Sequence, residues 1–171
     1  MRILRLLMVC APILAVCGCG IPEGPFGDLR VPASDAPELK GRWCFNGDEQ
    51  GFLGFIEIDD DGAPVTLEDN PAIGDDLGVD VVMLDGRVRV SDNGLQYAAV
   101  GSAVTSGDDV TIYLEFRVAR YGYEFSATAI KMEGTRTEAD RVDGVAVTIQ
   151  NADGEDTLAI EAGAATRPGC D

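Results

Sequence analysis

The residue types that most often carry chemistry are unevenly represented in this chain. It has no histidine, 30 acidic residues and 13 basic residues. Without an imidazole, neither a Ser-His or Cys-His dyad nor a His-ligated zinc site can form. Paired carboxylates such as Asp75 and Asp76 fall in turn-like segments, where acidic residues initiate turns and favour solubility. The sequence therefore predicts a protein that is not an enzyme and needs no cofactor, with a carboxylate-only enzyme as the catalytic alternative.

Four carboxylates have the spacing of a calcium-binding EF-hand loop, with a glycine at its sixth position. They are Glu57, Asp59, Asp61 and Glu68. The flanking segments alternate as strands do, and Pro64 takes a position normally given to a branched apolar residue. A solvated acidic turn is therefore the favoured interpretation, and weak Ca²⁺ binding by a β-hairpin is the alternative.

Aromatic and basic residues are densest between positions 113 and 123. We predict a ligand or partner face from this group together with the only tryptophan: Trp43, Tyr113, Arg117, Tyr121 and Tyr123. Such residues combine apolar area with hydrogen-bonding capacity. The alternative is an exposed sheet face with Tyr-Arg cross-strand pairs.

The N-terminal residues have the order of a secretory signal. Arg2 and Arg5 precede an apolar run, 6–16, which is too short to span a bilayer. The following Val-Cys-Gly-Cys sequence resembles the lipobox of bacterial lipoproteins, in which a small residue precedes the cysteine that is lipidated and becomes the new N-terminus. Gly18 fits that position before Cys19, whereas the branched Val16 precedes Cys17. An ordinary secretory signal and an N-terminal membrane helix are the alternatives.

The lipobox resemblance implies a signal peptide, 1–18, and a lipid on Cys19 that anchors the chain to a membrane. Gly20 follows the cysteine, where an aspartate retains enterobacterial lipoproteins in the inner membrane. The resemblance thus implies an outer-membrane lipoprotein facing the periplasm. Removal of the leader takes away two arginines and no acid, so the net charge changes from −17 to −19. That charge argues against nucleic acid as a partner and against docking on anionic headgroups.

Cys44 and Cys170 are the cysteines that remain once the leader is removed and Cys19 is acylated. In an oxidising compartment we expect them to form a disulfide, with two unpaired buried thiols as the alternative.

The rest of the chain divides into a tether, 19–38, and a single β domain, 39–171. The tether holds half of the prolines and reads as an extended linker. In the domain, short apolar runs alternate with Asp-, Asn- and Gly-rich turns. They predict strands at 39–46, 52–59, 65–68, 79–84, 87–91, 95–104, 110–120, 123–129, 145–150 and 157–162. We expect a hairpin at Asp85-Gly86, a loop at 70–78 and an irregular segment at 134–141.

This pattern predicts an all-β fold: an antiparallel meander closed into a roughly eight-stranded barrel, with a two-sheet β-sandwich as the alternative. Gly41-Arg42-Trp43 resembles the Gly-x-Trp of lipocalins and avidin-like barrels, where the tryptophan closes one barrel end. Taken together with the lipobox resemblance, the predicted barrel leads us to expect an envelope lipoprotein that binds an apolar small molecule or an envelope protein. The alternative is a structural or inhibitory module with a solid core. Small strand residues suit either a cavity or a packed centre: Ala98, Gly101, Ala103, Ala127 and Ala129.

Overall fold

The computed structural model describes residues 31–46, 54–68, 77–121, 123–151 and 154–166. A short 3₁₀ helix, η1 (Pro37–Leu39), precedes the strands. The strands are β1 (Gly41–Asn46), β2 (Gly54–Ile58), β3 (Pro64–Glu68), β4 (Val81–Met83), β5 (Arg89–Val90), β6 (Gln96–Ser106), β7 (Asp109–Arg120), β8 (Tyr123–Glu138), β9 (Arg141–Asn151) and β10 (Gly154–Thr166).

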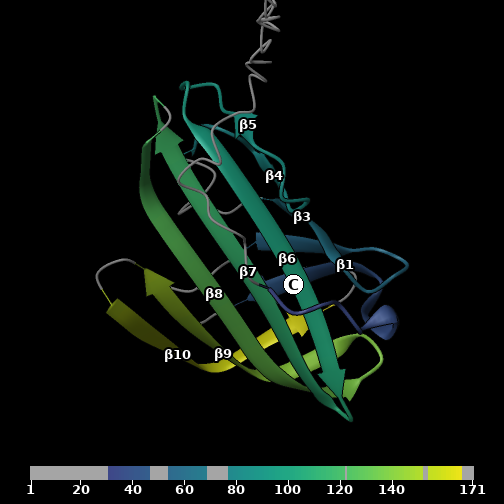
Figure 1. The fold of residues 1–171 in the computed structure, drawn as a ribbon. Coiled ribbons are helices and arrows are strands. Elements are labelled where there is room, and N and C mark those ends of the chain that lie inside the picture. Colours follow the sequence, from purple (N-terminus) through teal and green to yellow (C-terminus); the bar gives the residue numbers. More distant parts are fainter. Residues whose placement is uncertain (1–30, 47–53, 69–76, 122, 152–153, 167–171) are drawn as a thin grey trace, which may run out of the picture.

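The strands follow one another as an antiparallel meander, in the order β4-β3-β2-β1-β10-β9-β8-β7-β6-β5. Pairing of β1 with β10 joins the two halves of the chain. Figure 1 shows β6, β7 and β8 as long neighbouring strands, with β1 behind them. The predicted all-β class with antiparallel strands is confirmed.

The predicted closed barrel is wrong. The end strands β4 and β5 have three and two residues and are not paired with each other. The end of the sheet that carries β4 meets β6 through an isolated bridge between Asp85 and Val100, where the Gly86 N–H donates to the Ala99 carbonyl over 2.8 Å. Such short strands cannot supply a continuous closing ladder. The described residues fit the alternative better: a β-sandwich of two antiparallel layers packed over one core.

Period-two alternation on β7 explains how the core forms. Val110, Ile112, Leu114 and Phe116 are buried, whereas the residues between them are partly exposed. Successive side chains of a strand point to opposite faces, so one side of β7 lies against the core and the other is the outer face. Trp43 of β1 is only 1% exposed, and its indole N–H donates to the Leu39 carbonyl over 2.6 Å.

The space between the layers is filled. The cavity beside Trp43, lined also by residues of β2, β7, β8 and β9, has a volume of about 10 Å³. That is about the volume occupied by one water-sized probe. On β6, Ala103 is fully buried, and a Cβ on Gly101 would lie 2.8 Å from the Pro64 Cβ. These two small inward residues of β6 therefore allow close approach of the layers.

Two local predictions are wrong. Asp85-Gly86 forms no hairpin, because β4 pairs with β3 while β5 pairs with β6, so this turn carries the chain from one end of the sheet to the other. The segment predicted to be irregular at 134–141 is strand: β8 continues through Gly134 to Glu138, and β9 begins at Arg141. Gly134 is tolerated there because Val142 fills the space that a Cβ would occupy.

Candidate functional site

The outer face of β7, β8 and β9 carries an open groove with a volume of about 260 Å³. Antiparallel register builds it from two rows of side chains. One row aligns Tyr113 with Lys131 and Lys131 with Thr148, and the next aligns Glu115 with Ala129 and Ala129 with Gln150. Val31, at the start of the described chain, also lines the groove. Hydroxyl, ammonium, carboxylate and amide groups therefore converge on one concave surface.

A largely buried ion cluster lies beside the groove. The Arg117 Nε and Nη2 atoms are each 2.7 Å from Glu115 Oε1, and Nη1 is 3.7 Å from Glu124 Oε2. The three side chains are between 13% and 18% exposed. Two carboxylates share one guanidinium, so this cluster has a net negative charge. Such a cluster at the centre of an outer sheet face favours binding of polar groups over binding of a purely apolar ligand.

Two buried polar atoms on this face have no hydrogen-bond partner within the described part of the chain. They are Glu124 Oε2 and the hydroxyl oxygen of Ser102, which pairs with Tyr113 across β6 and β7. An unsatisfied buried polar atom costs about 1–3 kcal/mol. The outer face thus retains hydrogen-bonding capacity that the described residues do not use.

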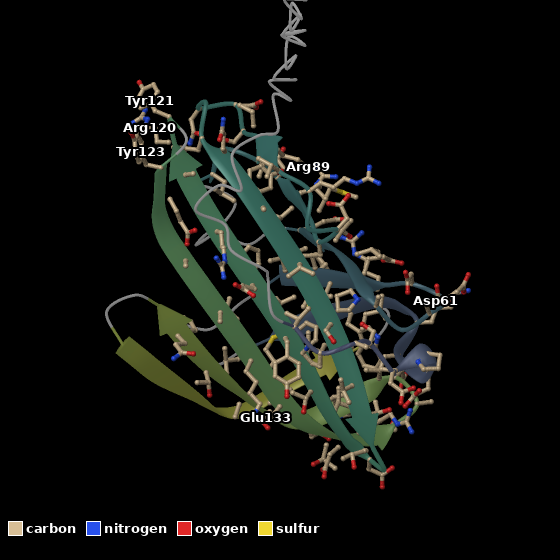
Figure 2. All side chains as sticks on the ribbon, in the orientation of Figure 1. Asp61, Arg89, Arg120, Tyr121, Tyr123 and Glu133 are labelled. Carbon is tan, nitrogen blue, oxygen red and sulfur yellow. The ribbon has the colours of Figure 1, made fainter. Side chains whose placement is uncertain are left out.

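The predicted aromatic face is divided between three places. Tyr113 lines the groove and Arg117 lies beside it, whereas Tyr121 and Tyr123 project from the β7–β8 hairpin (Figure 2). Trp43 lies in the core and shares no surface with them. Alternation on β7 was the signal that separated Tyr113 and Arg117 from the core. Nothing local in the sequence showed that β1 faces inward at Trp43.

Two of the four predicted calcium ligands, Asp59 and Glu68, use their carboxylates in other contacts. The Asp59 carboxylate accepts the N–H groups of Asp61 and Ala63 over 3.0 and 2.9 Å, which closes the turn after β2. Glu68 Oε2 is 2.8 Å from the Arg42 Nη2 atom. Glu57 lies on β2, where it pairs with Arg42. Within the described ranges, no three carboxylate or cysteine side chains are grouped as a metal site would require.

The predicted cysteine chemistry falls partly outside the described residues. Cys19 and Cys170 are both outside them. Cys44 is buried on β1, opposite Thr166 on β10. Cys170 follows Thr166 by four positions in the sequence and lies outside the described residues. The disulfide between Cys44 and Cys170 stays a prediction.

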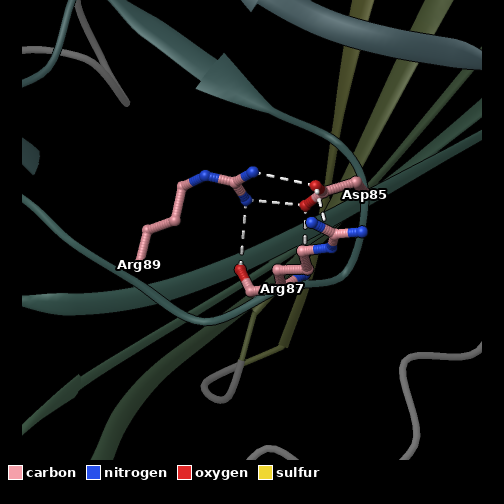
Figure 3. Close-up of polar contacts among 3 residues, drawn as sticks. All are labelled: Asp85, Arg87 and Arg89. Carbon is pink, nitrogen blue, oxygen red and sulfur yellow. Dashed lines mark hydrogen bonds and ion pairs between the residues drawn. The ribbon is translucent and has the colours of Figure 1, made fainter.

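Sequence reasoning missed the ionic contact at the crossover after β4 (Figure 3). Arg89 Nη1 and Nη2 donate to Asp85 Oδ1 and Oδ2 over 2.6 and 2.8 Å, and the Arg87 N–H donates to Oδ1 over 3.1 Å. The hydrogen bonds from Arg89 hold the pKa of the Asp85 carboxyl well below its ordinary range. The signal was present as Asp-Gly-Arg-x-Arg, but it was assigned to a hairpin.

Among the residues that the structure describes, no helix has the length and apolar character that a membrane crossing requires. No protein-family model, curated protein or solved structure matches this chain.

Proposed function

We propose that this chain is a non-enzymatic lipoprotein of the bacterial envelope whose solid β domain binds an envelope protein. In this proposal, the lipid on Cys19 anchors the chain to the outer membrane on its periplasmic side. The lipobox-like sequence before Cys19 and the proline-rich tether support the anchor. The outer groove of about 260 Å³ is the binding surface.

One observation carries the choice of a solid binding module over a hollow carrier of an apolar molecule. The cavity beside Trp43 measures about 10 Å³, whereas even a small ligand needs a pocket of about 300 Å³. The outer groove is more than twenty times larger and opens on a sheet face. Its floor is a regular array of strand side chains, which suits an extended peptide segment.

The polar lining favours a protein over a lipid as the occupant of the groove. Lys131, Thr148 and Gln150 supply donors that can bind carbonyl or carboxylate oxygens, and Tyr113 adds aromatic area with a hydroxyl. An apolar occupant would cover the Thr148 and Gln150 side chains without offering them hydrogen bonds, at a free-energy cost.

Photo-crosslinking in intact cells tests the groove. A photoreactive residue replaces Ala129, which is exposed and lines the groove, and Asp61, in the turn after β2, is the matched exposed control position. We expect a covalent adduct of one defined mass from position 129 and none from position 61. Thr148→Trp fills the groove and is expected to abolish that adduct while the circular dichroism spectrum keeps its strand signal. The same adducts from both positions would contradict the proposal.

A titration with fatty acids and phospholipids tests the alternative of an interior ligand. Trp43 lines the cavity between the layers, so entry of an apolar molecule would change its fluorescence. We expect the emission to stay unchanged across the panel. A saturable change in emission, together with a bound species in native mass spectrometry, would favour the hollow carrier.

A further inference from the structure

Exposed apolar side chains gather at one end of the sheet. Of the five large hydrophobic residues that are exposed in the described chain, three belong to this end, and we call them, with Arg120, the aromatic rim: Val90, Tyr121 and Tyr123. Tyr121 and Tyr123 are 87% and 77% exposed. Single exposed apolar residues are ordinary, but a cluster on one edge marks a contact surface.

Strand register places these residues together. Val90 pairs with Gln96, Gln96 pairs with Ala119, and the next residue, Arg120, pairs with Tyr123. The end of β7 and the start of β8 thus share one edge of the sheet with β5. Figure 2 shows Arg120, Tyr121 and Tyr123 together at the tip of the hairpin, with Glu133 toward the opposite end of β8.

The backbone holds Tyr121 outward in a conformation that is unusual for a bulky residue. Its φ of 54° makes it the one non-glycine residue with positive φ in the described chain. Such conformations cost of order 1–3 kcal/mol and are concentrated at functional sites. The Arg120 guanidinium carbon is 5.7 Å from the centre of the Tyr121 ring. The tip therefore combines amphipathic rings with a cation, as do residues at the boundary between a bilayer and water.

We propose that the aromatic rim docks in the headgroup region of the phospholipid bilayer to which the chain is anchored. This inference rests on the proposed lipid at Cys19. The contact presents Tyr121 and Tyr123 to the interface, while the groove on the outer face stays accessible to a protein. The anchor raises the local concentration of lipid around the rim, so a contact that is weak by itself suffices.

The length of the tether permits this contact. Eleven residues lie between Cys19 and Val31, and these twelve residue steps span at most roughly 40 Å when fully extended. Val31 and Tyr113 line the same groove, and the seven-residue step from Tyr113 to Arg120 along β7 covers about 24 Å. With the rim on the membrane, the chain therefore reaches from the bilayer to Val31 with length to spare.

The net charge of the protein determines which lipid headgroups the rim can approach. The net charge of the mature chain opposes binding to anionic bilayers, so aromatic and apolar contact must provide the attraction. At the tip, Arg120 adds a positive charge beside the Tyr121 ring. We therefore expect docking on zwitterionic phosphatidylcholine.

Depth-dependent quenching tests the proposal on the mature lipidated protein in phosphatidylcholine vesicles. Tyr121→Trp and Tyr123→Trp each place a reporter on the rim, and Glu133→Trp is the matched exposed control. Trp43, buried in the core, contributes the same background to all three variants. With phospholipid brominated near the carbonyl groups, we expect loss and a blue shift of the rim emission and no change for Glu133→Trp.

The outcomes separate the docking from the anchor. If the protein co-sediments with vesicles but quenching at the rim and at position 133 is equal or absent, the docking is overturned and the anchor stands. A rim that contacts a protein instead of the bilayer would give this result. Failure to co-sediment would overturn the anchor and the docking that rests on it. Quenching at the rim that disappears in Tyr121→Ser/Tyr123→Ser, with co-sedimentation retained, supports the inference.

Discussion

Asp85 holds Arg89 through two hydrogen bonds at the point where the chain passes from one end of the sheet to the other. The backbone of Asp85 also bridges Val100 on β6. One residue therefore fixes the crossover by its side chain and joins the ends of the sheet by its main chain. Because β4 and β5 are so short, this contact replaces the ladder that would close a barrel.

Loss of the Asp85 carboxylate should destabilise the domain. Both side chains are about one-third exposed, so we expect Asp85→Asn to lower the free energy of unfolding by only about 1 kcal/mol. The control is Asp92→Asn, an exposed turn residue with the same change in charge, for which we expect no measurable effect. Urea denaturation followed by circular dichroism measures both. Equal effects of the two substitutions would show that net charge, and not the contact with Arg89, is responsible.

The same contact predicts how stability depends on pH. The pKa of Asp85 in the folded domain lies below its ordinary value of 3.8, chiefly because of the hydrogen bonds from Arg89. Its contribution is therefore present above that value and is lost as the pH falls toward the folded-state pKa. The difference in unfolding free energy between wild type and Asp85→Asn should be constant from pH 7 to about 5 and shrink below about 4. A difference that grows on acidification would contradict this assignment.

Close approach of the layers makes Gly101 intolerant of a larger side chain. A Cβ there would lie 2.8 Å from the Pro64 Cβ and 3.1 Å from a methyl group of Leu84. We expect Gly101→Val to cost about 1–3 kcal/mol through overpacking, despite the higher strand propensity of valine. Ser106→Val, at the exposed end of the same strand, is the control and should be nearly neutral. The midpoint temperatures of thermal unfolding of both variants test this prediction. A higher midpoint for Gly101→Val would show that the interior can hold a larger side chain.

Strand positions could be predicted because their signals are local. Alternation on β7 gave its bounds to within one residue and identified its buried residues. The segment after Ile130 was misread because Thr, Arg and Glu at 135–138 are polar on both faces. They remain strand since β9 pairs with them, and that partner lies beyond any local window.

Whether the sheet closes, and which residues form the groove, depends on contacts between segments that are far apart in the sequence. No local pattern encodes those contacts. Asp85-Gly86 suits a hairpin by itself, and only the pairing of β5 with β6 shows that it is a crossover. Likewise, Tyr113 was identified as a surface residue, but the groove also needs Lys131, Thr148 and Val31. Register between β7, β8 and β9 brings the first two together with Tyr113, and the path of the chain before η1 adds the third.

Cys19 is predicted to carry the lipid. Gly18 permits cleavage before it, and each buried methylene contributes about 0.8 kcal/mol to membrane retention, so more than one acyl chain gives durable anchoring. We expect Cys19→Ser to abolish labelling by radioactive palmitate and to leave an unprocessed precursor. Cys17→Ser is the matched control and should be labelled and processed normally. Labelling that persists in Cys19→Ser would assign the lipid to another residue.

The predicted disulfide between Cys44 and Cys170 would join β1 to the end of the chain after β10. Cys44 is buried on β1 opposite Thr166 of β10. A covalent link between Cys44 and Cys170 would hold the two halves of the meander together. Closing a loop of about 125 residues stabilises by roughly 4–5 kcal/mol on chain-entropy grounds, with less usually realised.

Intact-mass measurement after alkylation without reductant tests that disulfide on the exported protein. We expect no alkylation until the protein is reduced and unfolded, and then two added groups. Cys170→Ser should lower the unfolding free energy and leave the Cys44 thiol reactive only on unfolding, because that side chain is buried. If wild type and Cys170→Ser unfold at the same urea concentration, the link between β1 and the C-terminal segment does not exist, and the pairing of β1 with β10 must hold the halves together without it.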